Sequence, residues 1–214
     1  MEETTSREKV LKKLRDALIS RSESPFPSLD LTSSVYKEIE DTLDITFAME
    51  FSKVSGKFIY CENEKELQEN LISLIGENKW KQVFCTEPEI KETLANTGIP
   101  FISLESEFTQ MDVGITYCEY LIARLGSIMI SSRQTSGRRL NVYPENHIVI
   151  ARSSQIVPDL KDALNNIKEK YKDNFPSMIS VITGPSRTAD IEKTLVMGAH
   201  GPRELYVFLI DEEK

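Results

Sequence analysis

The stretch KFIYCENEKELQENLISLIGENKWKQVFCTEPEIKETLANTGIPFISL, residues 57–104, decides the fold class. Three short apolar runs within it, FIYC, QVFCT and IPFISL, have the length and composition of buried β-strands. Two amphipathic stretches separate them, and their spacing predicts helices over residues 64–76 and 87–96. This alternating order favours parallel strands with helices packed on the sheet faces. The sequence therefore predicts an α/β fold with a mainly parallel sheet flanked by helices.

The chain beyond this stretch continues the alternation less regularly. Apolar runs bounded by polar or glycine-containing segments predict further strands, and amphipathic spacing predicts further helices. No internal repeat interrupts the pattern. The predicted elements are strands at 126–132, 147–152, 177–183 and 204–210 and helices at 154–170 and 188–196.

The first part of the chain is predicted to be helical and then extended. Residues 7–18 carry apolar side chains at the spacing of an amphipathic helix, which we interpret as a docking or swapping arm. The segment SRSESPFPSLD, residues 20–30, contains two prolines and reads as a linker. A second helix is predicted over residues 34–53, where large apolar residues recur every four positions. We therefore divide the chain into an arm and linker, 1–33, and an α/β domain, 34–214.

Composition and charge exclude some classes of function. The 214 residues are 40% apolar and 28% charged, which is an ordinary globular balance. A net charge of -8 argues against binding nucleic acid through a broad basic surface. The start, MEETTSREKV, shows neither a secretory signal nor a membrane anchor, and no run approaches the roughly 20 apolar residues of a membrane helix. We expect a cytoplasmic protein.

The three cysteines, Cys61, Cys85 and Cys118, are far apart in the sequence and odd in number. They predict no disulfide framework and no close metal-binding pair, which fits a reducing compartment. Each follows an apolar, strand-like run, so we interpret them as small buried hydrophobes, with a reactive thiol as the alternative.

The segment ITGPSRTADIEKTLVMGAHGPRELYVFLI, residues 182–210, carries the most prominent candidate site. It is predicted to run strand, glycine turn, helix, glycine turn, strand. Where a strand leads into a helix of a parallel sheet, glycine backbone and helix N-terminal N–H groups bind anions. The alternative, that these residues only cap a short helix, stays open. The predicted ligand-binding residues here are Gly184, Ser186, Arg187, Thr188, Asp190, His200 and Gly201.

A second candidate site lies within residues 118–160, where a polar loop follows an apolar strand. Hydroxyl groups, backbone N–H groups and guanidinium groups in such a loop can hold a carboxylate or a phosphate. The nucleotide-binding patterns GxxxxGK[ST] and GxGxxG do not occur in the sequence. The alternative is a solvated hairpin with surface arginines. The predicted ligand-binding residues here are Gly126, Ser127, Ser131, Ser132, Arg138 and Arg139.

The two histidines do not suggest a metal site. His147 immediately precedes the apolar run IVIA, which favours a strand-end residue over a catalyst. His200 lies beside a Gly-Pro turn, where a histidine serves as a proton carrier, a ligand or a hydrogen-bonded turn residue. Because neither has a carboxylate at ligand spacing, we predict no metal centre.

Most of the chain resembles the LUD domain family, the C-type lactate-utilisation proteins of bacteria. The amphipathic helix near the start, LGSIMISSRQTSGRRLNVYPENHIVIARSSQIVPDL at 125–160 and above all ITGPSRTADIEKTLVMGAHGPREL at 182–205 carry this resemblance. It implies a fold like that of ribose-phosphate isomerases, sugar-phosphate deaminases and coenzyme A transferases. It also implies a role in oxidising L-lactate to pyruvate with two iron–sulfur partner proteins.

The resemblance further implies that this chain is the subunit without clusters. Three scattered cysteines cannot supply a four-cysteine cluster, so we expect no cofactor on this chain and electron transfer by its partners. One departure concerns Arg124 and Leu125, which stand where the family is expected to have an acidic residue and a hydroxyl. This change removes a candidate carboxylate from the predicted site, or adds a cation that strengthens carboxylate binding.

Two other functions stay open. One is a stand-alone enzyme acting on a sugar phosphate or an acyl thioester, which rests on analogy of fold alone. The other is an interaction module without catalysis, in which helix 7–18 binds a partner or a second copy of the chain.

Overall fold

The computed structural model of the protein describes residues 5–19, 36–191 and 194–212. Two compact units make up the chain, Met1–Glu38 and Ile39–Lys214. Helix α1, Ser6–Ile19, belongs to the first unit and confirms the helix predicted over 7–18. The predicted linker, and the predicted boundary at residue 34, lie outside the described residues.

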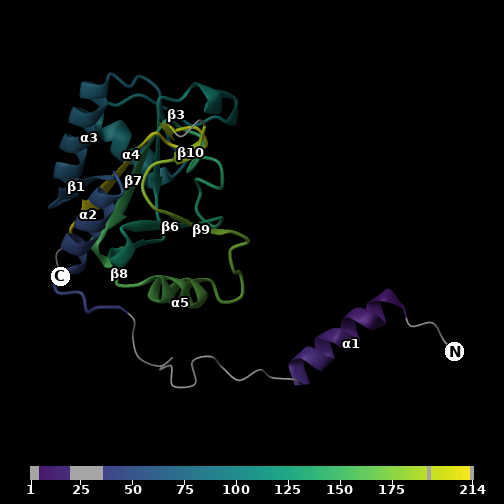
Figure 1. The fold of residues 1–214 in the computed structure, drawn as a ribbon. Helices are drawn as coiled ribbons and strands as arrows, with labels where there is room; N and C mark the ends of the chain where they lie inside the picture. The colour runs from purple at the N-terminus through teal and green to yellow at the C-terminus, as the bar shows by residue number, and fades with distance from the viewer. Residues whose placement is uncertain (1–4, 20–35, 192–193, 213–214) are drawn as a thin grey trace. The chain divides into compact units, whose positions relative to one another are not determined.

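A six-stranded parallel sheet forms the centre of the second unit (Figure 1). Its order is β1-β12-β7-β4-β2-β3, and each strand pairs with its neighbours in parallel. Each strand therefore begins at one edge, the amino edge, and ends at the opposite one, the carboxyl edge. The strands are β1 Lys57–Cys61, β2 Val83–Phe84, β3 Phe101–Ile102, β4 Val113–Tyr117, β7 Asn146–Arg152 and β12 Glu204–Ile210.

Two helices, α3 (Glu64–Asn78) and α4 (Pro88–Thr97), cover one face of this sheet and confirm the helices predicted at 64–76 and 87–96. Asn63 caps α3 by accepting a hydrogen bond from the backbone of Glu66. Gly98 ends α4 in the left-handed conformation that glycine adopts without strain. The buried apolar faces of both helices pack against β4, β7 and β12.

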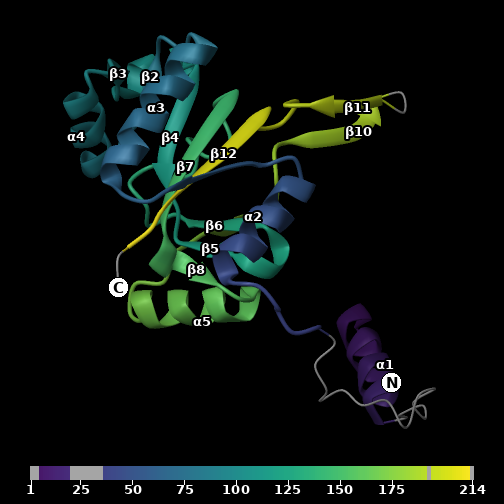
Figure 2. The same ribbon diagram turned by 90° about the vertical axis from the view of Figure 1, so that its left-hand side faces the viewer.

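A second, four-stranded sheet packs on the other face, with order β8-β5-β6-β9 (Figure 2). Helix α2, Leu43–Lys53, packs in the same core through Phe47 and Phe51. Helix α5, Leu160–Tyr171, covers the outer face of the four-stranded sheet. The strands are β8 Ile156–Val157, β5 Tyr120–Ile122, β6 Ser127–Ser131 and β9 Ile179–Ile182.

Short elements complete the unit. Three 3₁₀ turns, η1 (Glu105–Gln110), η2 (Ala123–Leu125) and η3 (Ser153–Gln155), connect strands. β10 (Arg187–Ile191) and β11 (Thr194–Met197) pair antiparallel beyond the start of β12 (Figure 2).

This hairpin corrects the helix predicted at 188–196. The segment is rich in β-branched residues, including Thr188, Ile191, Thr194 and Val196, which favour extended backbone. With few apolar residues at helical spacing on one side, local preference for strand decided the structure.

Two other helix predictions were too long at their starts. The helix predicted at 34–53 begins at Leu43, because Asp41 and Thr42 favour caps over helix interiors and Thr42 has extended backbone angles. The helix predicted at 154–170 begins at Leu160, since Pro158 disfavours helical backbone before it and Asp159 forms a capping box.

The cysteines are buried and free, as the interpretation as small hydrophobes predicted. Burial raises the pKa of the thiols of Cys61 and Cys118, and raises that of Cys85 to about 12. Within the part of the chain that the structure describes, no helix is long and apolar enough to cross a membrane.

Candidate functional site

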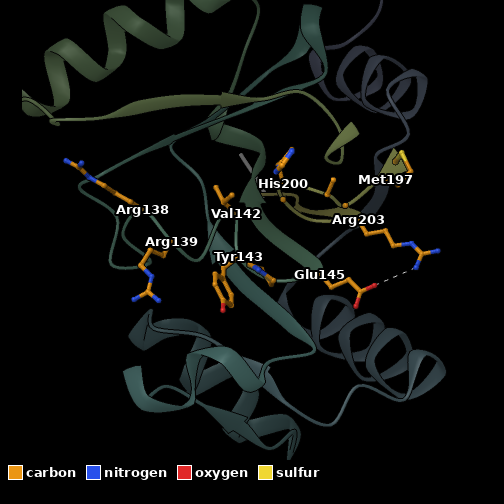
Figure 3. A pocket seen from close by; sticks show the side chains of 12 residues that line it. Arg138, Arg139, Val142, Tyr143, Glu145, Met197, His200 and Arg203 are labelled. Carbon is orange, nitrogen blue, oxygen red and sulfur yellow. Dashed lines mark ion pairs between the residues drawn. The ribbon is translucent and has the colours of Figure 1, made fainter. Parts of the chain in front are cut away.

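An open cleft, here called the outer cleft, lies at the amino edge beside the starts of β7 and β12 (Figure 3). Its volume is about 770 Å³. The loop before β7 and the loop before β12 supply its walls, so the parallel pairing of these strands brings the two loops together. The outer cleft is lined by Arg138, Arg139, Val142, Tyr143, Pro144, Glu145, Met197, Gly198, Ala199, His200, Gly201 and Arg203.

Cations outnumber anions along the outer cleft, although the chain has a net charge of -8. The guanidinium group of Arg139 lies 4.3 Å from the ring centroid of Phe108, a cation–π distance. Arg203 forms an ion pair of 3.6 Å with Glu145, drawn as the dashed line in Figure 3. Such a cleft attracts small anions while staying open to solvent.

A smaller cavity of about 200 Å³, the inner cavity, adjoins the outer cleft and shares Arg138, Val142, His200 and Gly201 with it. Apolar side chains from both sheets make much of its lining. Its other lining residues are Ile130, Asn141, Met178, Ser180, Ile182, Gly184, Pro185, Ser186, Pro202 and Leu205.

Asn141 is the polar residue of the inner cavity with an unmade hydrogen bond. It is 1% exposed, and its Nδ2 donates to the carbonyl of Gly137 at 3.2 Å. Its Oδ1 is buried and has no hydrogen-bond partner among the described residues. A buried acceptor without a donor costs free energy, so Oδ1 offers a favourable place for a ligand hydroxyl.

His147 lies in β7, paired in register with Leu205, which lines the inner cavity. It is fully buried, and its Nε2 shares a hydrogen bond of 2.9 Å with the Thr116 hydroxyl. Burial lowers its pKa to about 4, so the imidazole is neutral at neutral pH. His147 is thus a buried strand residue near the start of β7, as its position before IVIA predicted.

The opposite edge holds a third site, the carboxyl-edge cavity, of about 350 Å³. It lies where β2, β4 and β7 end, and in parallel α/β sheets this edge commonly holds ligands. The carboxyl-edge cavity is lined by Glu87, Glu89, Tyr117, Cys118, Glu119, Arg133, Gln134, Thr135, Arg152, Gln155, Lys170 and Tyr171.

Glu119 binds three side chains at one wall of the carboxyl-edge cavity. Its Oε1 accepts hydrogen bonds from Ser131 Oγ at 2.5 Å and Tyr171 OH at 2.8 Å. Its Oε2 is 2.8 Å from Lys170 Nζ. Although burial lowers the pKa of Lys170, the hydrogen bond and charge of Glu119 outweigh it and raise that pKa overall. The buried carboxylate thus holds an ammonium and a phenol at fixed positions.

The residues predicted to bind a ligand do not form one site. The inner cavity brings together Arg138, Gly184, Ser186, His200 and Gly201 from the two predicted segments. Arg139 lines the outer cleft, and Ser131 binds Glu119 at the other edge.

The other predicted hydroxyl groups are engaged within the fold. Ser127 is buried and bonds Thr183 at 2.8 Å between hydroxyl oxygens. Ser132 lies 3.1 Å from the Ser177 hydroxyl and accepts from the Met178 backbone. Neither residue lines the outer cleft, the inner cavity or the carboxyl-edge cavity.

Two of the glycines predicted to bind a ligand instead allow close approach of the backbone of helix α2 and its C-cap. Gly126 has a φ of 55°, and a Cβ there would lie 2.3 Å from the backbone nitrogen of Phe51. Gly184 has a φ of 73°, and a Cβ there would lie 2.2 Å from the Val54 carbonyl oxygen. Both positions need glycine for packing.

The expected anion cradle at a helix N-terminus after Gly184 is wrong, because the chain enters strand β10 there. Arg187 is exposed and Thr188 is half-buried in this strand. Asp190 also lies in β10, and its side chain is outside the described residues. Neither helix capping nor a helix dipole acts at this turn.

Arg124, the expected departure from the family pattern, forms an ion pair with Asp159 at 2.6 Å between Nε and Oδ1. Asp159 is the N-cap of α5, so the arginine ties η2 to that helix. This contact gives the arginine a structural role.

Sequence reasoning missed Glu87, Glu119 and Lys170. Glu87 and Glu119 each follow a strand of the parallel sheet by two or three residues, a position that could have drawn attention to them. Lys170 lies far away in the sequence, on α5. As for metals, no group of three or more potential His, Cys, Asp or Glu ligands occurs in the described parts of the chain.

The parallel sheet, the packed second sheet and the cavities at its edges define an α/β protein with ligand-sized sites. A DUF162 family protein from Deinococcus radiodurans has a similar fold, with a TM-score of 0.59 and 20% identity over 78% of this chain and 96% of that chain. Residues 46–210 match the LUD domain. The chain therefore belongs to the LUD domain family.

Curated relatives have similar sequences. Uncharacterized protein YkgG of Escherichia coli K12 is 31% identical over 69% of this chain and 66% of the relative. Lactate utilization protein C of Bacillus subtilis strain 168 is 37% identical over 48% of this chain and 44% of the relative. The chain thus matches from about half to about two thirds of the length of these relatives.

Proposed function

We propose that this protein acts in lactate utilisation and binds a small organic anion, of the size of lactate or pyruvate, at the amino edge. The names of its relatives support the process, because several are called lactate utilization protein C. The observation that carries the ligand class is the cation-lined outer cleft, which adjoins the inner cavity, where Asn141 Oδ1 has no hydrogen-bond partner among the described residues.

The chemistry of the inner cavity fits a three-carbon acid. Arg138 and His200 line both the outer cleft and the inner cavity, and one guanidinium nitrogen of Arg138 donates to the Ser177 hydroxyl. The other guanidinium nitrogens and the His200 imidazole are the donors that this site offers to a carboxylate. The apolar residues beyond them suit a methyl group, and Asn141 Oδ1 accepts from a hydroxyl. In this arrangement Asn141 distinguishes lactate, which has a hydroxyl donor, from pyruvate, which has none.

The oxidation step itself belongs, in this proposal, to iron–sulfur partner proteins. Converting lactate to pyruvate breaks one C–H and one O–H bond and releases two electrons and two protons. The three cysteines of this chain are buried and separate, which is unsuited to holding a four-cysteine cluster. This chain then binds or positions the acid, binds no redox cofactor, and its partners accept the electrons.

Growth on L-lactate tests the role. Deleting the gene in a strain that uses L-lactate should abolish growth on it, and the intact gene should restore growth. Purification of the tagged protein from those cells should recover iron–sulfur proteins. Unchanged growth of the deletion strain would contradict the proposed role.

Titration calorimetry tests the site. Replacing Arg138 with glutamine should weaken pyruvate binding about tenfold, the effect of one charge-assisted hydrogen bond. Asn141→Leu should weaken lactate binding more than pyruvate binding. Ser132→Ala is the matched control, because Ser132 was predicted from sequence to bind but lies outside the inner cavity. If Arg138→Gln and Asn141→Leu bind both acids as tightly as the control Ser132→Ala does, this site is ruled out.

An interaction module is the second candidate, because α1 exposes an apolar stripe. Val10, Leu11, Leu14 and Leu18 are each at least 45% exposed. Removing residues 1–19 should lower the oligomeric mass, or the recovery of partners, if α1 binds a protein. An unchanged mass together with unchanged partner recovery would contradict this role.

A further inference from the structure

The carboxyl-edge cavity lies where three adjacent parallel strands end. Residues just after β2, β4 and β7 line it together with residues from α5. Since β4 pairs with both β2 and β7, these strand ends lie side by side. The backbone leaves the sheet here, so side chains from several strands converge on one volume.

Glu87 is the residue of this cavity with an unmade hydrogen bond. It is 6% exposed, and its Oε2 accepts from the Thr86 hydroxyl at 3.2 Å. Its Oε1 is buried and finds no hydrogen-bond partner in the described ranges. Because burying a carboxylate oxygen without a donor is unfavourable, the cavity calls for a ligand that donates a hydrogen bond.

Whereas Glu87 needs a hydrogen-bond donor, Lys170 offers donors to an acceptor on the ligand. Its ammonium group has three N–H donors, and the hydrogen bond to Glu119 uses one of them. The side chain is 51% exposed, so the remaining donors stay accessible. Arg133, also exposed, lines the same cavity and donates to the Asn174 carbonyl through Nε at 2.9 Å. These cations suit an anionic group on the ligand.

The fixed positions of these groups restrict the class of ligand. Glu119 holds Lys170 and Tyr171, and Gln134 links the loop after β6 to the Tyr117 carbonyl at 2.8 Å. A cavity of about 350 Å³ is at the small end of the range for ligand sites. An apolar molecule leaves both the Glu87 acceptor and the Lys170 donors unmatched, while a simple anion matches only the cations.

We propose that the carboxyl-edge cavity is a second binding site, for a small carboxylate that carries a hydrogen-bond donor on the carbon next to its carboxyl group. A 2-hydroxy acid and a 2-amino acid share this chemistry. The carboxylate lies toward Lys170, and the hydroxyl or ammonium donates to Glu87 Oε1. This site is separate from the inner cavity and does not depend on the role proposed for it.

Three acids of nearly equal size test the proposal by titration calorimetry on the full chain. L-lactate carries a hydroxyl, L-alanine carries an ammonium, and propionate carries neither. We expect lactate or alanine to bind at least about tenfold more tightly than propionate, since a hydrogen bond to a charged group contributes about this much. Preference for lactate identifies a hydroxy-acid site, and preference for alanine identifies an amino-acid site.

Single-residue variants show at which edge of the parallel sheet the preference over propionate arises. Glu87→Gln should reduce the preference over propionate about tenfold, whereas Asn141→Leu, in the inner cavity, should leave the contribution of the carboxyl-edge cavity unchanged. Thr135→Trp provides a second test, because Thr135 is exposed at the cavity and tryptophan there blocks it without disturbing the core.

Three outcomes would overturn the proposal. The first is equal affinity for all three acids in the intact protein. The second is a preference that Asn141→Leu removes and Glu87→Gln leaves intact, which places all the binding in the inner cavity. The third is unchanged binding in Thr135→Trp. Failure of the lactate growth test, by contrast, contradicts only the proposed function.

Discussion

The two edges of the six-stranded sheet differ in the segments that line them and in the burial of their charged side chains. At the amino edge, the loops before β7 and β12 form an open cleft, and its charged side chains Arg138, Arg139 and Arg203 are exposed. At the carboxyl edge, residues just after the strands line a smaller cavity, and the carboxylates Glu87 and Glu119 are buried. The same parallel sheet thus has one edge where the charged groups lining the cleft are all exposed and one edge that combines buried carboxylates with exposed cations.

This difference indicates that a charged group affects stability most where it is buried. An exposed ion pair such as Arg203 with Glu145 is weakened by water and salt. The buried Glu119 carboxylate has three hydrogen-bond donors at fixed distances. We therefore expect the amino edge to tolerate substitution and to bind anions in a salt-dependent way, and the carboxyl edge to be sensitive to single changes.

Replacing Glu119 with alanine should have the largest effect on stability. The change leaves Ser131 Oγ, Tyr171 OH and the Lys170 ammonium without their shared acceptor. We expect a loss of about 4 kcal/mol in the free energy of unfolding. Urea denaturation followed by circular dichroism measures it, and a loss below about 1 kcal/mol would show that the carboxyl edge is no more rigid than the amino edge.

His147 should make stability depend on pH. Its folded pKa of about 4 lies below its ordinary value of 6.5, so the unfolded chain takes up the proton first. Stability should therefore be complete above pH 6.5 and fall by up to roughly 3 kcal/mol as the pH drops toward 4. Urea denaturation across this range should show a shallower fall for His147→Gln than for the intact protein.

The other histidine provides the control for that experiment. His200→Gln should keep the pH dependence of the intact protein, because His200 is exposed at the outer cleft. An identical fall in both variants would contradict the assignment of the effect to His147.

Gly126→Ala separates packing from ligand binding at a predicted site residue. A Cβ there meets the α2 backbone at Phe51, and the φ of 55° is unfavourable for alanine. We expect a loss of about 3 kcal/mol, combining backbone strain with overpacking. Thermal denaturation measures it. Gly76→Ala in α3 is the matched control, where nothing lies within 4 Å and alanine should stabilise by about 0.5–1 kcal/mol.

Arg203→Ala should have the smallest effect on stability, below about 1 kcal/mol, since its pairing with Glu145 is exposed on both sides. If anions bind in the outer cleft, the same change should flatten the dependence of pyruvate affinity on salt concentration. Calorimetry at two ionic strengths measures this dependence. A stability loss as large as that of Glu119→Ala would remove the contrast between the two edges.

The sequence predicted regular elements well where side-chain period and caps agreed. Helices α3 and α4 carry clear apolar faces, α3 begins at the side-chain cap Asn63 and α4 ends at Gly98, and strand β12 is a continuous apolar run. The hairpin of β10 and β11 was predicted as a helix, because a short segment between two glycine turns has too few residues to show a period.

The candidate site was predictable only in part. Glycines, hydroxyl residues, arginines and a histidine at 126–139 and 184–201 attracted attention, and five of these residues share the inner cavity. Gly126 gave the same local signal, yet it makes room for α2. The sequence alone cannot tell a glycine needed for a ligand from one needed for a helix, because both require the same backbone.

The sequence by itself determined the class of fold, the buried cysteines and the family, because each depends on local pattern and composition. Only the tertiary structure decided which polar residues meet. Glu87, Glu119 and Lys170 are distant in the chain, and parallel pairing of β2 with β4, together with packing of α5, brings them to one cavity. Burial then increases the energetic effect of their charges, and this effect cannot be predicted from local sequence pattern.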